Sequence, residues 1–256
     1  MPSDRLKQAP LLAVFAHPDD EFAVFPWLRR AISEGRKVEA VWLTDGGWGG
    51  QDTVRRRAES IAVLSSLGLD PVSMHFCGEE WQVPDGELHL RLHEVVPRLL
   101  ERLGRAGVGG EVLMPAWEGG HHDHDASHLA GIRLAQARGA RMSQYSLYHG
   151  QGLSGPWFRV LSPLPANGVV ETLPTTLGER LHCAALCLRY RSQWKSFVGL
   201  LPFYLWRMRR ADAFWRQPVD PRRTAQRPHE DPMLYERRGG PQWADFATAT
   251  AAYRQD

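Results

Sequence analysis

A histidine and three acidic residues stand close together near the start of the chain, in the run Ala16-His17-Pro18-Asp19-Asp20-Glu21. Imidazole nitrogens and carboxylate oxygens are ligands for metal ions such as zinc. One aspartate at a helix start could serve as an N-cap, but three adjacent acids repel one another unless a cation or a proton compensates their charge. We therefore favour a metal site over helix capping for this run.

A second cluster lies much further along the chain, in the run Gly119-Gly120-His121-His122-Asp123-His124-Asp125. It has no cysteine beside it, and its histidines are too closely spaced for a closed structural zinc site. Together the two clusters can supply two histidines and a carboxylate, which leaves metal positions open for water and substrate. Such an open site is typical of catalytic metal ions. His128 is expected on a helix face and His122 in the site wall.

The elements that would position these clusters alternate between strands and helices. Short apolar runs predict strands at 11–16, 38–44, 72–77, 111–116 and 145–148, and helical spacing predicts helices at 27–34, 54–67, 88–103 and 125–137. This alternation predicts an α/β, Rossmann-like fold, in which a mostly parallel sheet carries helices on both faces. Beyond residue 150 we expect one strong helix, 177–198, and then an irregular C-terminal extension.

A parallel sheet brings the carboxyl ends of its strands to one edge, and ligands bind outside that edge. The segments that leave the predicted strand ends are 17–21, 45–50, 78–86 and 117–125. They contain both clusters and most of the other residues that could do chemistry. We therefore expect the two clusters to meet at this edge of the sheet.

The first cluster resembles a motif of the LmbE-like, or PIG-L, family of zinc-dependent de-N-acetylases. The second part of that family pattern is Gly-His-x-Asp-His, which is Gly120 to His124 here. Lesser matches are Thr44-Asp45-Gly46, Arg56-x-x-Glu59 followed by Leu67-Gly68, and Tyr190-x-Ser192-Gln193. The resemblance spans about residues 11–195. It departs at Val24-Phe25-Pro26-Trp27, where the family has glycines, and in the tail from Pro202 onward, which has no counterpart.

The resemblance implies a metal-dependent hydrolase. It would remove an acetyl or other acyl group from the amide nitrogen of an N-acetylglucosamine-type amino sugar or its conjugate. His17, Asp20 and His124 are then the metal ligands, with Zn²⁺ as the expected ion and Fe²⁺ as another divalent candidate. Asp19 is the general base that takes a proton from the attacking water.

Four further residues receive roles from the same resemblance. His121 is the acid or the imidazole that stabilises the oxyanion, and Asp123 orients it and favours its cationic form. Arg56 and Asp45 are expected to bind the substrate. The amino sugar, free or as a glycoconjugate, is the expected small-molecule partner.

Three alternatives remain open at this point. His17, Asp19 and His124 also match the two-histidine, one-carboxylate triad of iron oxygenases. A non-catalytic sugar-binding protein of the same fold is a second possibility, although every expected catalytic position is filled. A metal-dependent amidase that acts on a non-sugar amide is the third, because nothing in the sequence names the amine that carries the acyl group.

The overall composition excludes several classes of protein. The chain has 256 residues, and 31 Lys and Arg nearly balance 29 Asp and Glu, so there is no general electrostatic case for a nucleic-acid partner. No apolar run approaches the roughly 18 residues that span a bilayer. The run 11–16 is too short for a secretory signal, and three cysteines, an odd number, argue against a disulfide framework. We therefore expect a cytoplasmic protein.

We expect a single domain over residues 1–256, with a core at about 11–199 and an extension at about 200–256; the oligomeric state stays open.

In the extension, aromatic residues alternate with arginines: Phe203, Tyr204, Trp206 and Trp215 with Arg207, Arg209, Arg210 and Arg216. We favour simple packing of this tail against the domain. The alternative is peripheral contact with a membrane or a lipid-linked substrate, which such residues also suit.

Overall fold

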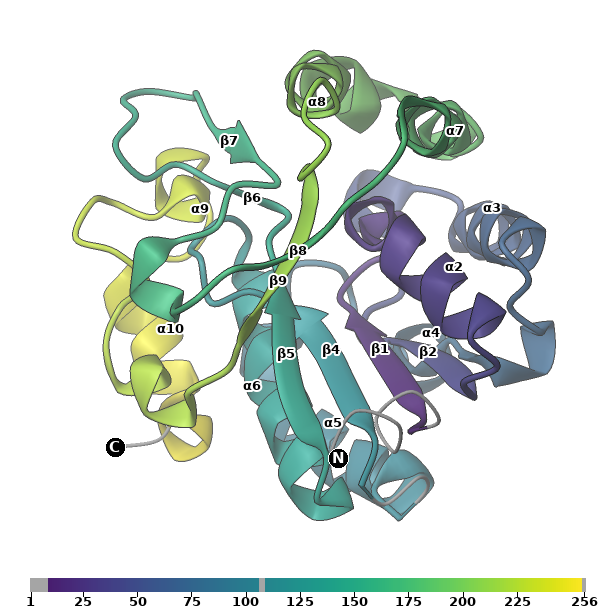
Figure 1. Cartoon of the computed structure of the whole chain (residues 1–256). Helices are drawn as coiled ribbons and strands as arrows, with labels where there is room; N and C mark the ends of the chain where they lie inside the picture. The colour runs from purple at the N-terminus through teal and green to yellow at the C-terminus, as the bar shows by residue number, and fades with distance from the viewer. Residues whose placement is uncertain (1–8, 106–108, 255–256) are drawn as a thin grey trace.

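The computed structural model describes residues 9–105 and 109–254, and its centre is a seven-stranded sheet in the order β3-β2-β1-β4-β5-β9-β8 (Figure 1). The strands are β1 Leu11–Phe15, β2 Val38–Trp42, β3 Met74–His75, β4 Glu111–Pro115, β5 Arg141–Tyr145, β8 Glu171–Leu173 and β9 Phe214–Pro218. The first five in this list pair in parallel, and β9 pairs antiparallel with β5 and β8. The predicted, mostly parallel α/β sheet is confirmed. A separate hairpin contains β6 Tyr148–His149 and β7 Arg159–Val160.

Helices cover both faces of the sheet, which explains why its central strands are apolar on both sides. In β1, Leu11, Ala13 and Phe15 enter one buried cluster. Leu12 and Val14 enter the other. The first cluster is covered by α2 Phe25–Ser33, α3 Thr53–Ser66, α7 Leu177–Cys187 and α8 Trp194–Arg207. The second is covered by α4 Cys77–Trp81, α5 Leu88–Leu103, α6 His122–Arg138 and α10 Trp243–Ala249.

Several predicted elements differ from the structure in their bounds. The fifth strand lies at 141–145 instead of 145–148, because Ser143 and Gln144 are buried polar residues that hydrogen-bond to Glu111 and to the carbonyl of Pro218. The single helix predicted at 177–198 is two helices, α7 and α8, separated by the short 3₁₀ turn Arg191–Gln193. The third strand is also shorter than predicted, because it begins after a 3₁₀ turn and α4 follows at once.

Helix α6 begins three residues earlier than predicted, at His122 instead of Asp125. His121 is its N-cap, and the imidazole Nδ1 accepts the backbone N–H of Asp123. Asp123 and Asp125 lie in the first turn, where carboxylates are favoured by the helix dipole. The second polar cluster is therefore the N-terminal turn of a helix that follows β4.

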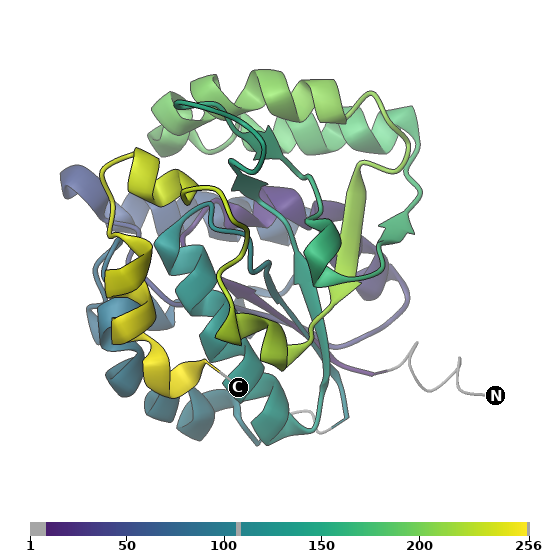
Figure 2. The same ribbon diagram turned by 90° about the vertical axis from the view of Figure 1, so that its left-hand side faces the viewer.

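The segment after Leu200 is more regular than expected. β9 lies inside the main sheet, and α9 Leu234–Arg237 and α10 follow it at the C-terminal end of the chain (yellow in Figure 2). Phe246 of α10 is fully buried in the cluster formed with α5 and α6. The last helices therefore complete the second face of the sheet.

Most of the aromatic tail residues pack against the domain, which agrees with the favoured prediction, but two arginines that were expected to stay in solvent pack there as well. Tyr204 and Trp215 are buried. Arg216 pairs with Glu111 at 2.6 Å and with Glu171 at 2.7 Å. Arg207 donates to the carbonyls of Leu161 and Asp212. Trp206, Arg209 and Arg210 are exposed, and 68% of the Trp206 surface is accessible. No helix in the described part of the chain combines the length and the apolar character needed to cross a membrane.

Candidate active site

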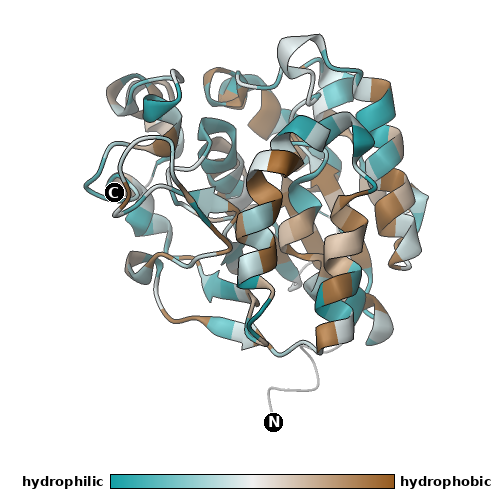
Figure 3. Cartoon of the chain, turned by 90° about the horizontal axis from the view of Figure 1, so that it is seen from above, coloured by the Kyte–Doolittle hydropathy of each residue, from teal (hydrophilic) through white to brown (hydrophobic). Residues whose placement is uncertain are grey.

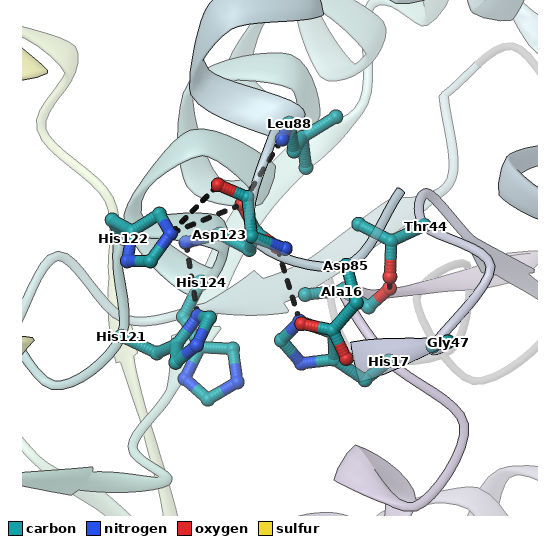
Figure 4. A network of polar contacts seen from close by, with 12 residues as sticks. Ala16, His17, Thr44, Gly47, Asp85, Leu88, His121, His122, Asp123 and His124 are labelled. Carbon is teal, nitrogen blue, oxygen red and sulfur yellow. Dashed lines mark hydrogen bonds and ion pairs between the residues drawn. The ribbon is translucent and has the colours of Figure 1, made fainter. Parts of the chain in front are cut away.

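The two polar clusters meet at the carboxyl ends of β1 and β4, where the strand order of the sheet reverses. A cavity of about 390 Å³ opens there. All four segments predicted from the strand ends contribute to its wall, for example through His17, Trp48, Asp85 and His121. Figure 4 shows the imidazoles of His17, His121 and His124 turned toward one another, with Asp85 beside His17. The predicted meeting of the clusters is confirmed.

The structure brings His17, Asp20 and His124 together. The Asp20 carboxylate lies 3.1 Å from Nε2 of His124 through Oδ1 and 3.7 Å from Nδ1 of His17 through Oδ2. Ligands bound about 2.1 Å from a tetrahedral ion lie about 3.4 Å from one another. The Asp20 carboxylate therefore lies beside both imidazoles, one on each of its oxygens.

The turn after β1 fixes the Asp20 carboxylate in place. Its Oδ2 accepts the backbone N–H groups of Ala16 and His17 at 3.0 and 2.9 Å. Burial raises the pKa of Asp20, but His124 and His17 outweigh burial and bring this pKa well below its usual range. The residue is thus an ionised acceptor that faces two imidazoles.

Other groups of side chains here could also hold a cation. His17, His121 and His124 have ring nitrogens within 4.8 Å of one another, and so do the polar atoms of His17, Asp85 and Asp123. A third group, in which His89 and His122 join Asp123, lies behind the cavity wall. His17 is common to the first two groups, which makes it the centre of the polar network.

The far side of the His17 ring faces two carboxylates. Its Nε2 lies 3.1 Å from Oδ1 of Asp85 and 3.2 Å from Oδ2 of Asp123. Burial lowers the pKa of His17, but Asp85 and Asp123 outweigh burial and raise this pKa well above its usual range. A metal-binding histidine commonly donates its second ring N–H to a carboxylate, which orients the ring. Asp85 and Asp123 are placed to do this for His17.

Substituting Asp85 by Asn is expected to weaken zinc binding about 10- to 100-fold, because the His17 ring loses a charged partner that orients it. The dissociation constant of zinc, measured by competition with a chelating dye in the absence of substrate, tests this. Glu87→Gln, which changes a half-exposed carboxylate two residues away, is the matched control. Unchanged zinc affinity in Asp85→Asn would mean that Asp123 alone orients the ring.

Asp19 lies beside the predicted metal ligands in a strained backbone conformation. Its φ is 124°, which is rare for a residue with a side chain, and such strain clusters at functional sites. Its backbone N–H donates to Oε2 of Glu21 at 2.7 Å, and its carboxylate lies 3.3 Å from the Arg56 guanidinium. Burial raises the pKa of Asp19 to about 7, against the opposing effect of Arg56.

Glu21 supports this turn from inside the core, a role that sequence reasoning missed. Its fully buried carboxylate accepts the Asp19 N–H, the indole N–H of Trp42 at 3.0 Å and the hydroxyl of Tyr190 at 3.2 Å. One donor from the same turn and two from distant segments thus hold one acid. The third acid of the run therefore fixes the backbone that presents Asp19.

His121 faces the cavity as a neutral imidazole. Burial and the neighbouring His17 lower its pKa well below the usual range. Because Nδ1 accepts the backbone N–H of Asp123, the ring proton is assigned to Nε2. The Asp123 carboxylate itself contacts His17 and the N–H groups of Gly86 and Leu88, so it reaches His121 only through its backbone. This differs from the expected side-chain contact that would favour a cation.

Gly120 explains how the His121 segment fits against its neighbours. A Cβ atom added at this position would lie 1.8 Å from the carbonyl oxygen of Tyr148. Only glycine allows the two backbones to approach this closely. The glycine before His121 therefore sets how deeply the imidazole enters the cavity.

The two residues predicted to bind substrate differ in position. Arg56 lines the cavity but is only 4% exposed, and its guanidinium donates to the carbonyls of Gly46 and Pro18 as well as to Asp19. Asp45 is outside the set of residues that line the cavity; its Oδ1 accepts the N–H groups of Gly47 and Asp85. Arg56 thus stabilises the turn after β1 that carries Asp19, and Asp45 positions the loop that carries Asp85.

Substituting Arg56 by Lys is expected to lower kcat about 10²-fold while the metal stays bound. Lysine keeps the charge but lacks the planar guanidinium that donates to Gly46, Pro18 and Asp19. A shift of about 1 Å in a catalytic group can lower a rate about 10²-fold. Steady-state kinetics with metal analysis tests it. Arg57→Lys is the control, because the Arg57 side chain is 51% exposed and pairs with Glu79. A metal-free Arg56→Lys protein would contradict the assignment.

The oxygenase alternative disagrees with the structure in two respects. It requires Asp19 as the ligand, whereas Asp20 is the carboxylate that contacts both His17 and His124. It also brings the expectation of a mostly β fold, and the sheet here is parallel and covered by helices.

Several cavity residues came from segments without a sequence signal. Tyr148, Phe197, Tyr235 and Arg238 all line the cavity and belong to no motif that the sequence singled out as part of the site. Only Gln193, in the Tyr-x-Ser-Gln match, had been marked by its sequence pattern. The C-terminal half of the chain therefore supplies a large part of the cavity wall.

Comparison with known proteins agrees with this fold. Residues 12–135 match the sequence model of the family described as PIG-L: GlcNAc-PI de-N-acetylase. No curated protein sequence matches the chain. A deacetylase triple mutant involved in the teicoplanin biosynthetic pathway has a similar structure, with a TM-score of 0.61, 17% identity and coverage of 82% of this chain and 98% of that one.

Two further solved structures are similar. N,N'-diacetylchitobiose deacetylase from Pyrococcus horikoshii has a TM-score of 0.55 and 15% identity, over 79% of this chain and 78% of that one. A conserved protein from Thermus thermophilus has a TM-score of 0.54 and 22% identity, over 88% of this chain and 100% of that one. At these identities the likeness establishes the fold. Residues 12–135, which contain both polar clusters, match the PIG-L family of de-N-acetylases.

Proposed function

We propose that this protein is a zinc-dependent de-N-acetylase of amino sugars or their conjugates. The observation that carries the proposal is the contact of the Asp20 carboxylate with both His17 and His124, with Asp19 beside them in the same cavity. The match of residues 12–135 to the PIG-L family supports it. Two of the similar structures, named as deacetylases of teicoplanin biosynthesis and of diacetylchitobiose, suggest the same chemistry.

His17, Asp20 and His124 would hold the zinc ion. When bound, the ion would lower the pKa of a water and polarise the amide carbonyl. The Nε2 of His124 faces Asp20 at 3.1 Å, and its buried Nδ1 has no hydrogen-bond partner among the described residues. The carboxylates of Asp85 and Asp123 keep the His17 ring in place from behind.

Asp19 and His121 would perform the proton transfer and charge stabilisation. Asp19 accepts a proton from the water whose oxygen attacks the carbonyl carbon. The Nε2–H of His121 donates to the oxyanion that forms on the former carbonyl oxygen. The C–N bond then breaks, the proton passes from Asp19 to the leaving nitrogen, and acetate and a free amine result.

The cavity has the size and lining of a sugar site. Its volume of about 390 Å³ is within the range of small-ligand pockets. Trp48, Tyr148 and Phe197 offer aromatic surface to the apolar face of a sugar ring. Free amino sugars, glycosides and lipid-linked amino sugars are all candidate substrates.

The cytoplasm remains the expected location, and Zn²⁺ is preferred over Fe²⁺ because the family resemblance implies a zinc enzyme. Cys77, Cys183 and Cys187 are all buried free thiols, as in a protein that stays reduced.

Acetate release from N-acetylglucosamine, its glycosides and lipid-linked forms is the direct test. We expect chelation to abolish activity and one equivalent of zinc to restore it. Full activity in a thoroughly metal-free preparation would contradict a metal-dependent mechanism. Activity on simple N-acetyl amines that equals activity on every sugar would favour a non-sugar amidase instead.

A further inference from the structure

Helices α7 and α8 carry an unusual outer surface. Three leucines of the α7 region are exposed: Leu177 by 61%, Leu181 by 59% and Leu188 by 63%. They follow one another at helical spacing, while Cys183 and Cys187 of the same helix are buried in the core. α7 is therefore apolar on both its inner and its outer side.

The neighbouring helix continues this surface. On α8, Trp194 is 59% exposed, Val198 64%, Leu205 44% and Trp206 68%. Trp157, in the loop between β6 and β7, is 60% exposed and lies 6.3 Å from Phe203 of α8 between ring centroids. Figure 1 shows α7 and α8 nearly end-on at one end of the molecule, and Figure 3 looks down on that end, where hydrophobic positions are visible along the outer helices.

The same segment is strongly basic. Residues 177–210 contain seven cations against the single acid Glu179: Arg180, Arg189, Arg191, Lys195, Arg207, Arg209 and Arg210. Four of these cations, Arg189, Arg191, Lys195 and Arg209, are exposed and have no acidic partner within ion-pair distance among residues 9–105 and 109–254. In a chain whose net charge is only +2, this is a local concentration of positive charge.

We propose that this α7–α8 surface binds the face of an anionic lipid bilayer, with both helices lying in the plane of the membrane. Exposed tryptophan and leucine beside unpaired lysine and arginine are the features of interfacial helices. The aromatic rings suit the headgroup level, and the cations complement anionic headgroups. A protein partner with a matching apolar groove would not account for the unpaired cations as directly.

The position of the surface connects it to the catalytic cavity. Ser196, Phe197 and Leu200 of α8 line that cavity. The surface also lies outside residues 12–135, which carry the family pattern, and shares only Trp206 and the cations of residues 207–210 with the tail residues that suit a membrane by sequence. Docking through α7 and α8 would hold the cavity mouth beside the bilayer.

Co-sedimentation with vesicles tests the proposal without any use of catalysis. The purified protein should sediment with vesicles of phosphatidylcholine and phosphatidylglycerol at low salt, and much less with phosphatidylcholine alone or at high salt. The triple variant Leu181→Ser, Leu188→Ser, Trp206→Ser should bind these vesicles at least about tenfold more weakly. The charge variant Arg189→Gln, Arg191→Gln, Lys195→Gln should lose the salt-dependent part of binding.

Matched controls distinguish binding through this surface from non-specific binding of exposed apolar residues to vesicles. Val54, Val72 and Leu90 are exposed by 69%, 79% and 53% on other helices and loops, and their triple serine variant should bind vesicles like the natural protein. Asp20→Asn should also bind normally, so a failure of the deacetylase proposal leaves this result intact. Absence of sedimentation with anionic vesicles, or equal loss in both serine triples, would overturn the proposal. So would a lipid-independent dimer that the Leu181, Leu188, Trp206 variant converts to monomers.

Discussion

Replacing Asp20 by Asn is expected to remove the metal from the protein, whereas replacing Asp19 by Asn should leave the metal bound and lower kcat about 10²- to 10⁴-fold. The two side chains are neighbours, but they face different partners. Asp20 contacts His17 and His124. Its Oδ2 also accepts the backbone N–H groups of Ala16 and His17. Asp19 contacts only the Arg56 guanidinium among the charged groups within ion-pair distance in the described residues.

Metal content after dialysis and kcat on one N-acetyl sugar, measured for both variants, separate these roles. Asp245→Asn, at an exposed position in α10, is the control for the loss of one negative charge. If Asp19→Asn lost the metal and Asp20→Asn kept it, the ligand set would be reversed. Asp19 would then be the carboxylate ligand, and the oxygenase-type triad would need to be reconsidered.

The parts of the fold that the sequence predicted are those whose signal is local. β1 is a continuous apolar run and β2 is apolar except for Glu39, because both faces of each strand are buried, and this pattern is visible without any partner. The parallel order then places the loops after β1 and β4 together, whatever their sequences are. That is why His17 and His124, far apart in the chain, could be expected in one site.

The parts that were missed depend on contacts between distant segments. β5 and β9 contain Ser143, Gln144 and Gln217, whose polarity hides a strand until their hydrogen-bond partners are known. Asp85 carries no motif, and it becomes part of the site only because Asp45 holds its loop against His17. The Asp123 carboxylate faces His17 and not its near neighbour His121, a choice that spacing along one helix does not determine.

Substituting Glu118 by Gln is expected to stabilise the protein more at about pH 8 than at about pH 5, relative to the natural chain. Glu118 is fully buried, and its Oε1 accepts the N–H groups of Leu147 and Tyr148 at 2.8 and 3.0 Å. Its Oε2 has no partner among the described residues. Burial raises the pKa of this carboxyl from 4.5 to about 8. At neutral pH the folded protein therefore holds a proton on Glu118 that the unfolded chain releases.

Because the folded state binds more protons between about pH 4.5 and about pH 8, the stability of the natural protein falls as the pH rises through this window, by about 1 kcal/mol per pH unit. Glutamine does not titrate, and its carbonyl oxygen can still accept both N–H groups. Urea unfolding of the metal-free proteins at several pH values measures the difference. Glu94→Gln, on the exposed side of α5, should follow the natural protein throughout. A stability difference between Glu118→Gln and the natural chain that stays constant with pH would show that Glu118 is ionised in the folded state, and that its two backbone donors stabilise the charge against burial.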